Sequence, residues 1–267
     1  MLKTIYVIAK NAFLEAVRSK ILHSVLLFGI LIVGISALFG SVSIGETFRV
    51  IKSFGYTIIS ISSVICVVIS GVSLFQKEIA QKTIYNILSK PVLRTNFLIG
   101  KFFGLWFTGS VLATLMMIML LAFLIPFEGS FDPLGFQALF FMILEIGVIS
   151  AVTILFSSVS VTPVLPGLFS FAVYIAGKSI FYLKSFSAPK VEQTSELSVI
   201  SQNVFLKRMI DLFDLVLPDL HLLTPYDQLV YSIGVGGDRM LFSLAYSISY
   251  MTVMIVIGSL FFSRRDF

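Results

Sequence analysis

The fold class is decided by the run at residues 102–127, FFGLWFTGSVLATLMMIMLLAFLIPF, which contains no charged side chain. A helix needs about 20 apolar residues to cross the roughly 30 Å hydrocarbon core of a bilayer. Because backbone groups in lipid must find their hydrogen-bond partners within the protein, an apolar run this long and continuous favours a helix over a barrel strand. The run therefore predicts a membrane-spanning α-helix.

The rest of the chain repeats this pattern. It is 57% hydrophobic and 12% charged, with 27 Phe in 267 residues, whereas a soluble domain is about half apolar and a quarter charged. These features predict an all-α integral membrane protein with six transmembrane helices, built as a single domain over residues 1–267. The six runs are Ile21–Val42, Ser53–Phe75, Phe102–Phe127, Phe136–Ser158, Leu165–Leu183 and Leu241–Phe262.

Basic residues near the ends of the runs predict the orientation. With the N-terminus inside, eleven Lys and Arg fall on the cytoplasmic side, and only Arg49 and Lys52 fall in the short outside loops. Both termini are therefore predicted to be cytoplasmic, in a multi-pass protein of the cell (inner or plasma) membrane. The net charge of +5 gives no support for nucleic-acid binding, because the basic residues flank apolar helices. The cytoplasmic set is Lys3, Lys10, Arg18, Lys20, Lys77, Lys82, Lys90, Arg94, Lys101, Arg264 and Arg265.

Two segments outside the apolar runs have amphipathic character. Residues 2–20 place apolar side chains at helical spacing, with Lys3, Lys10 and Arg18 on the other side, which predicts a helix lying along the inner membrane surface. The extracytoplasmic loop at 184–239 contains two short amphipathic helical patterns, at 205–217 and 220–231, that are too short and too charged to span. They are predicted to dip into the bilayer or to cap the bundle.

The cytoplasmic connection at residues 76–94 is charged and helix-prone until Leu88, and Pro91 then breaks the pattern. A helix that a membrane protein keeps in the cytosol favours contact with a soluble partner, the alternative being a solvated connector. Trp106 follows shortly afterwards and is expected near the inner head-group level, where indole rings settle.

This connection and the start of the next run contain an ordered set of residues: Glu78, Thr83, Leu88, Ser89, Pro91, Val92, Arg94, Phe97, Gly100, Lys101 and Gly104. With this set they resemble the membrane subunit of ABC-2 type (type V) ABC transporters. One residue departs from the family pattern, since Lys82 stands where a Gly usually precedes the Thr. The amphipathic leader, the six runs and the outer helical pieces extend the resemblance over nearly the whole chain.

The resemblance implies a permease subunit that seats its cytoplasmic loop helix in a groove of a separate ABC ATPase (nucleotide-binding) subunit. That partner would bind ATP and Mg; the chain itself would bind no cofactor and would pair with a second permease copy or a similar permease. Export of a hydrophobic or amphipathic substrate is expected. The coupling residues implied are Glu78, Lys82, Thr83, Ile84, Ile87, Leu88, Pro91 and Arg94.

The chain lacks the phosphate loop that ATP hydrolysis would need. Gly177-Lys178-Ser179 matches the end of Gly-x-x-x-x-Gly-Lys-[Ser/Thr], but Ala172 stands at the first glycine position and the triplet lies in an apolar run. ATP hydrolysis is therefore expected in a partner. His23 and His221 have no neighbouring ligands that would indicate a zinc site.

Two ionisable residues lie deep in the apolar runs. Glu145 and Lys178 are both predicted to lie roughly 10 to 15 Å below the outer face, counted at 1.5 Å per residue. Such groups are rare in membrane helices and are usually paired or face a cavity. One hypothesis is an ion pair that closes the bundle near its outer side. In the alternative, Lys178 reaches outward to the interface while Glu145 is protonated or hydrogen-bonded elsewhere.

Two other functions compete with the permease. An intramembrane enzyme is disfavoured, because Glu145 and Lys178 are the only clear ionisable residues in the runs and neither has a histidine beside it. The second alternative is an ABC-type membrane subunit that transmits ATPase motion to an extracytoplasmic protein without transporting substrate itself. The long loop at 184–239 keeps this alternative open.

Overall fold

The described secondary structure is entirely helical in the computed structural model, which covers residues 2–42, 47–80, 94–128, 132–160, 162, 164–187, 208 and 217–263. The all-α prediction is confirmed for these residues. The helices are α1 (Leu2–Arg18), α2 (Lys20–Val42), α3 (Thr47–Ala80), α5 (Arg94–Glu128), α6 (Leu134–Val159), α7 (Val164–Ser187), the 3-10 turn η1 (Leu220–Leu223), α10 (Tyr226–Val230) and α11 (Gly237–Ser263).

Five helices of the described chain are long and apolar enough to cross a membrane, and they correspond to the last five predicted runs. In the first run, helix α2 contributes a shorter apolar stretch at Leu22–Ile32. The chain is thus a multi-pass membrane protein, while a sixth span and the sidedness of the termini stay predictions. The five stretches are Phe48–Lys77, Thr95–Ile125, Leu134–Val159, Val164–Phe181 and Gly237–Ser263.

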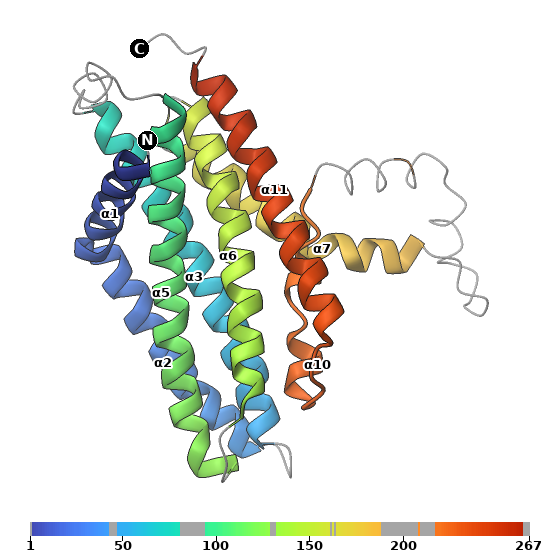
Figure 1. Cartoon of the computed structure of the whole chain (residues 1–267). Coiled ribbons are helices and arrows are strands. Elements are labelled where there is room, and N and C mark those ends of the chain that lie inside the picture. The colour runs from blue at the N-terminus through green and yellow to red at the C-terminus, as the bar shows by residue number, and fades with distance from the viewer. Residues whose placement is uncertain are drawn as a thin grey trace.

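Helices α3, α5 and α6 form the centre of the bundle (Figure 1). Helices α1 and α2 lie on one side of this centre, and α7 and α11 lie on the other. Helices α3 and α6 bury most of their surface, whereas α7 and α11 leave most of theirs exposed. The C-terminal end of α7 points away from the bundle.

Helix α3 begins earlier than the sequence predicts. Its start at Thr47 places Arg49 and Lys52 in the helix, so their assignment to an outside loop is wrong. The physical reason is an ion pair: Lys52 is fully buried, with its Nζ 2.8 Å from Asp132 Oδ2 just before α6. A charge can be buried in a helix when it has such a partner.

Helix α1 packs closely against α5, and small residues make this possible. A Cβ atom added at Gly104 would lie 2.8 Å from the backbone oxygen of Ala9 and 2.6 Å from Ala12 Cβ. At Gly100 it would lie 2.8 Å from the side chain of Ile8. Glycines four residues apart on one helix are a common way to bring two membrane helices close together. The predicted helix at 2–20 is confirmed as a helix, and its place at the membrane surface stays a prediction.

The short elements η1 and α10 pack on the bundle through buried apolar side chains. Leu220 and Leu223 of η1 and Leu229 of α10 are fully buried, and the two elements contact α3, α6 and α7. They correspond to the second of the two helical patterns predicted in the 184–239 loop. The first pattern, at 205–217, lies almost entirely outside the described residues.

Trp106 is held by contacts with a neighbouring helix, and its place at the inner head-group level stays a prediction. Its indole Nε1–H donates a hydrogen bond to the backbone oxygen of Ile143, 2.8 Å away in α6. A Cβ atom added at Gly147 would lie 2.9 Å from the same nitrogen. A glycine on α6 therefore leaves room for the ring, and the indole joins α5 to α6.

Candidate functional site

A buried polar network lies inside the bundle, centred on Glu145 of α6. This residue is fully buried, about 16 Å along the helix from Leu134. The structure brings it together with Lys178 of α7, whose Nζ lies 3.1 Å from Glu145 Oε1. The geometry is that of the ion-pair hypothesis, and it differs from the alternative in which Lys178 points away from Glu145.

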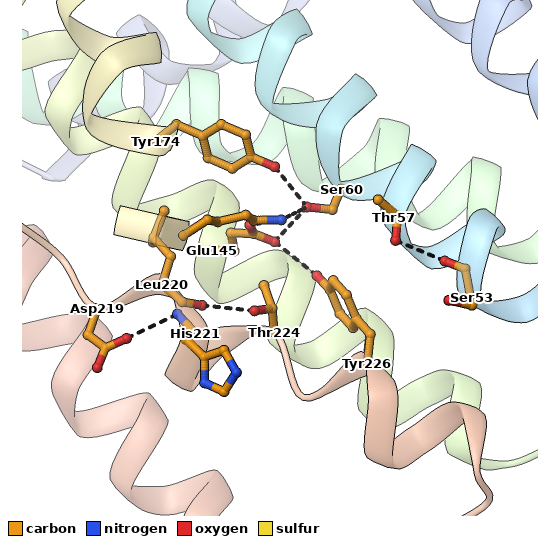
Figure 2. Close-up of polar contacts among 11 residues, drawn as sticks. Ser53, Thr57, Ser60, Glu145, Tyr174, Asp219, Leu220, His221, Thr224 and Tyr226 are labelled. Atoms are coloured by element: carbon orange, nitrogen blue, oxygen red, sulfur yellow. Dashed lines mark hydrogen bonds and ion pairs between the residues drawn. The ribbon is translucent and has the colours of Figure 1, made fainter. Parts of the chain in front are cut away.

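Two hydroxyl groups complete the surroundings of the carboxylate (Figure 2). Ser60 of α3 donates to Glu145 Oε2 at 2.8 Å, and Tyr226 of α10 donates to the same oxygen at 2.9 Å. Lys178 Nζ also donates to Ser60 Oγ at 3.2 Å. A buried charge costs several kcal/mol unless it is paired and hydrogen-bonded, and Glu145 satisfies both conditions.

Two aromatic rings flank the ammonium group of Lys178. Its Nζ lies 4.9 Å from the ring centroid of Tyr174 and 6.0 Å from that of Tyr226. A cation near an aromatic face is attracted by the electron density of the ring. The Tyr174 hydroxyl is also 3.4 Å from Ser60 Oγ. The network therefore joins four elements, α3, α6, α7 and α10.

The chemistry of these five groups suits a structural closure. They comprise one carboxylate, one ammonium group and three hydroxyls, and each hydroxyl lies within 3.4 Å of another polar group of the network. Sequence reasoning identified Glu145 and Lys178 but missed Ser60, Tyr174 and Tyr226. One signal was available, since Tyr174 and Lys178 are four residues apart and therefore share a helix face.

The segment that carries Tyr226 is fixed at its other end as well. Asp219 Oδ1 accepts the backbone N–H of His221 at 3.1 Å and so caps η1, while the Asp219 N–H donates to the Tyr246 hydroxyl of α11 at 2.8 Å. The His221 ring stacks on Phe181 of α7, with the centroids 3.6 Å apart. Burial lowers the pKa of His221, because it disfavours the imidazolium. The stack is therefore made by a neutral ring at physiological pH.

We expect Tyr226→Phe to loosen η1 and α10. The change keeps the ring and removes one hydrogen bond to a buried carboxylate, which is worth about 1.5 to 3 kcal/mol. Hydrogen exchange measured by mass spectrometry should then be faster in residues 217–236. Tyr231→Phe is the matched control, because Tyr231 is 61% exposed. Equal protection in both variants would contradict an anchoring role for the Tyr226 hydroxyl.

Most of the predicted coupling residues lie outside the described residues, namely Lys82, Thr83, Ile84, Ile87, Leu88 and Pro91. Glu78 belongs to the last turn of α3, and Arg94 is the first residue of α5. These two ends lie at the same end of the bundle (Figure 1). The structure therefore places the helices on both sides of the segment, and the coupling role itself stays a prediction.

Helix α1 contacts both of these helices near that end. Glu15 Oε1 lies 3.2 Å from Lys77 Nζ, close to the end of α3. On the other side, α1 packs on Gly100 and Gly104 near the start of α5. Sequence reasoning did not predict this connection. Its signal was the spacing of the two glycines, which is typical of close helix packing in membranes.

Comparison with known proteins identifies the family of the chain. The sequence matches the family model of the ABC-2 family transporter protein over residues 16–182. This range contains α2 to α6, most of α7, the 76–94 segment, and Ser60, Glu145, Tyr174 and Lys178 of the network. Among curated proteins, none matches the sequence. The match covers more than half of the chain, which therefore belongs to the ABC-2 family of transporter membrane proteins.

Proposed function

We propose that this chain is the permease subunit of an ATP-driven ABC transporter, with six spans and both termini in the cytoplasm. The observation that carries the proposal is the arrangement around the 76–94 segment. The two helices on either side of it belong to the bundle core and meet α1 at one end. The C-terminal end of α11 lies at the same end of the bundle, since Phe262 stacks on Phe97 of α5 with the ring centroids 5.9 Å apart.

In the proposed mechanism, separate ATPase subunits bind ATP and Mg and contact the 76–94 segment. Glu78, Lys82 and Arg94 orient this contact, and Ile84, Ile87 and Leu88 are buried in it. Movement of the ATPase subunits displaces α3 and α5 as rigid bodies. Helix α1 follows both, because it contacts each of them.

The buried network serves in this proposal as the closure on the outer side. Four elements meet at Glu145, so an outward opening between them must separate or jointly move these groups. The substrate is a hydrophobic or amphipathic molecule, exported by a pair of permeases. The pair is two copies of this chain or this chain with a similar one.

Co-purification tests the proposal. A tagged chain isolated from its native membranes should bring with it a protein that has a phosphate loop and hydrolyses ATP. The double variant Glu78→Ala/Arg94→Ala should lose this protein. Asp238→Ala/Arg239→Ala is the matched control, because it removes the same two kinds of charge at the start of α11 and should retain the partner. Retention of the ATPase by both variants would contradict the coupling assignment.

One observation favours a second function, in which ATPase motion is passed to an extracytoplasmic protein. Tyr226 links the outer segment directly to the network at Glu145. Deletion of residues 185–202 distinguishes the two functions. A transporter should keep ATP-dependent export after the deletion. A motion-transmitting subunit should lose its extracytoplasmic partner, while ATP hydrolysis by the ATPase subunits stays coupled to this chain.

A further inference from the structure

An apolar groove, here called the α1–α5 groove, lies between helices α1 and α5. Its volume is about 650 Å³, which is within the range of small-molecule sites. Phe13 of α1 and Phe103, Trp106 and Phe107 of α5 provide most of its aromatic lining. Phe103 is 44% exposed and Phe107 is 57% exposed, so the described part of the chain does not fill the groove.

The part of the groove around Trp106 and Ser110 offers only hydrocarbon, because its polar groups are already paired. The Trp106 indole N–H donates to the backbone oxygen of Ile143 at 2.8 Å. The Ser110 hydroxyl donates to the backbone oxygen of Trp106, also at 2.8 Å. A ligand in this part of the groove would therefore find aromatic and aliphatic surface and no free hydrogen-bond donor.

The groove carries a positive charge where it borders a second pocket near the start of α5. Lys10 is exposed and lines both the groove and an adjacent pocket of about 260 Å³, which Asn11 and Lys101 also line. Residues 2–20 contain four basic side chains and a single acidic one, Glu15. That carboxylate already lies 3.2 Å from Lys77. The charge at Lys10 therefore suits an anion.

We propose that the α1–α5 groove binds a negatively charged phospholipid, with one acyl chain in the groove and the head-group phosphate at Lys10. Phe103, Phe107 and Ser110 follow one another over about 10 Å along α5, so they offer a continuous surface to a segment of an acyl chain that lies along this helix. Basic residues on amphipathic helices attract anionic lipids. The lysine stem can follow apolar surface while its charge stays with the head groups. Such a lipid would brace α1 against α5 whatever the transported substrate is.

Trp106 provides a direct test, because it is the single tryptophan of the chain and lines the groove. The full-length protein is reconstituted in phosphatidylcholine bilayers that contain a minor fraction of phospholipid with brominated acyl chains. Brominated phosphatidylglycerol should quench Trp106 fluorescence more strongly than the same fraction of brominated phosphatidylcholine. Lys10→Gln should reduce the ratio of the apparent binding constants for phosphatidylglycerol and phosphatidylcholine about fivefold, as expected for the loss of one lysine near the membrane surface.

Lys3→Gln is the matched control, because Lys3 is an exposed lysine of the same helix that does not line the groove. It should keep the preference for phosphatidylglycerol. The Trp106 emission maximum in unbrominated lipid verifies that each variant retains the native surroundings of the ring. Equal quenching by both lipids in the wild type would overturn the proposal and indicate ordinary bulk lipid. Quenching by neither lipid would overturn it as well and indicate that a second copy or another protein covers the groove. An equal loss of the preference for phosphatidylglycerol in Lys10→Gln and Lys3→Gln would also overturn it, because the preference would then come from general surface charge.

Discussion

Replacement of Glu145 by alanine is expected to lower the free energy of unfolding by about 3 to 5 kcal/mol, the usual cost of removing one partner of a buried ion pair. The change leaves the ammonium group of Lys178 without its counter-ion and removes the acceptor of the Ser60 and Tyr226 hydroxyls. Thermal unfolding of the purified protein in detergent, followed by circular dichroism, measures the loss.

A second variant separates the ion pair from general damage to the core. Glu145→Gln combined with Lys178→Met removes both charges, and most of the lost stability should return, because neutral replacement of a buried pair is often close to neutral in free energy. If the loss of unfolding free energy in the double variant equals the sum of the losses in Glu145→Gln and Lys178→Met alone, Glu145 and Lys178 are not coupled. Unchanged assembly and transport in Glu145→Gln would likewise contradict a role for the pair in closing the bundle.

Gly104→Val is expected to displace α1 from α5. The added side chain would meet the backbone oxygen of Ala9 at 2.8 Å and Ala12 Cβ at 2.6 Å, and a backbone atom cannot move aside as a flexible side chain can. Overpacking of this kind costs about 1 to 3 kcal/mol. Backbone amides of α1 should exchange hydrogen faster, as measured by mass spectrometry, while those of α11 keep their protection.

The control for this variant is Gly34→Val in α2. A Cβ atom at Gly34 meets no heavy atom within 4 Å, and valine is no less favourable than glycine inside a helix. Exchange in α1 should therefore stay as in the wild type. If Gly104→Val also left α1 fully protected, the close glycine contact would not be what holds this helix in place.

The helices could be predicted from the sequence because each long apolar run leaves the backbone a single way to satisfy its hydrogen bonds in lipid. The helix ends were harder to predict. Arg49 and Lys52 were expected to lie outside α3, since charges normally mark the edge of the bilayer. The partner that allows Lys52 to be buried, Asp132, lies 80 residues further along the chain and cannot be read from the run itself.

The candidate site was predictable only in part, for a similar reason. Glu145 and Lys178 could be found because an ionisable group deep in an apolar run is unusual by itself. Ser60 and Tyr226 could not, because serine and tyrosine are common in membrane helices and loops. They come to Glu145 from 85 and 81 residues away, respectively. The pairing depends on how the helices cross, which no local pattern contains.

Helix α3 makes polar contacts with other helices and loops at three positions along its length, and these three contacts differ in strength. Lys52 and Ser60 hold it through buried polar contacts, whereas Lys77 meets Glu15 in a pair whose side chains are 53% and 34% exposed. Exposed ion pairs contribute little and weaken with salt. If α3 is displaced as the proposed mechanism requires, we expect the largest displacement at the end that leads into residues 81–93, because the polar contact there is the weakest of the three.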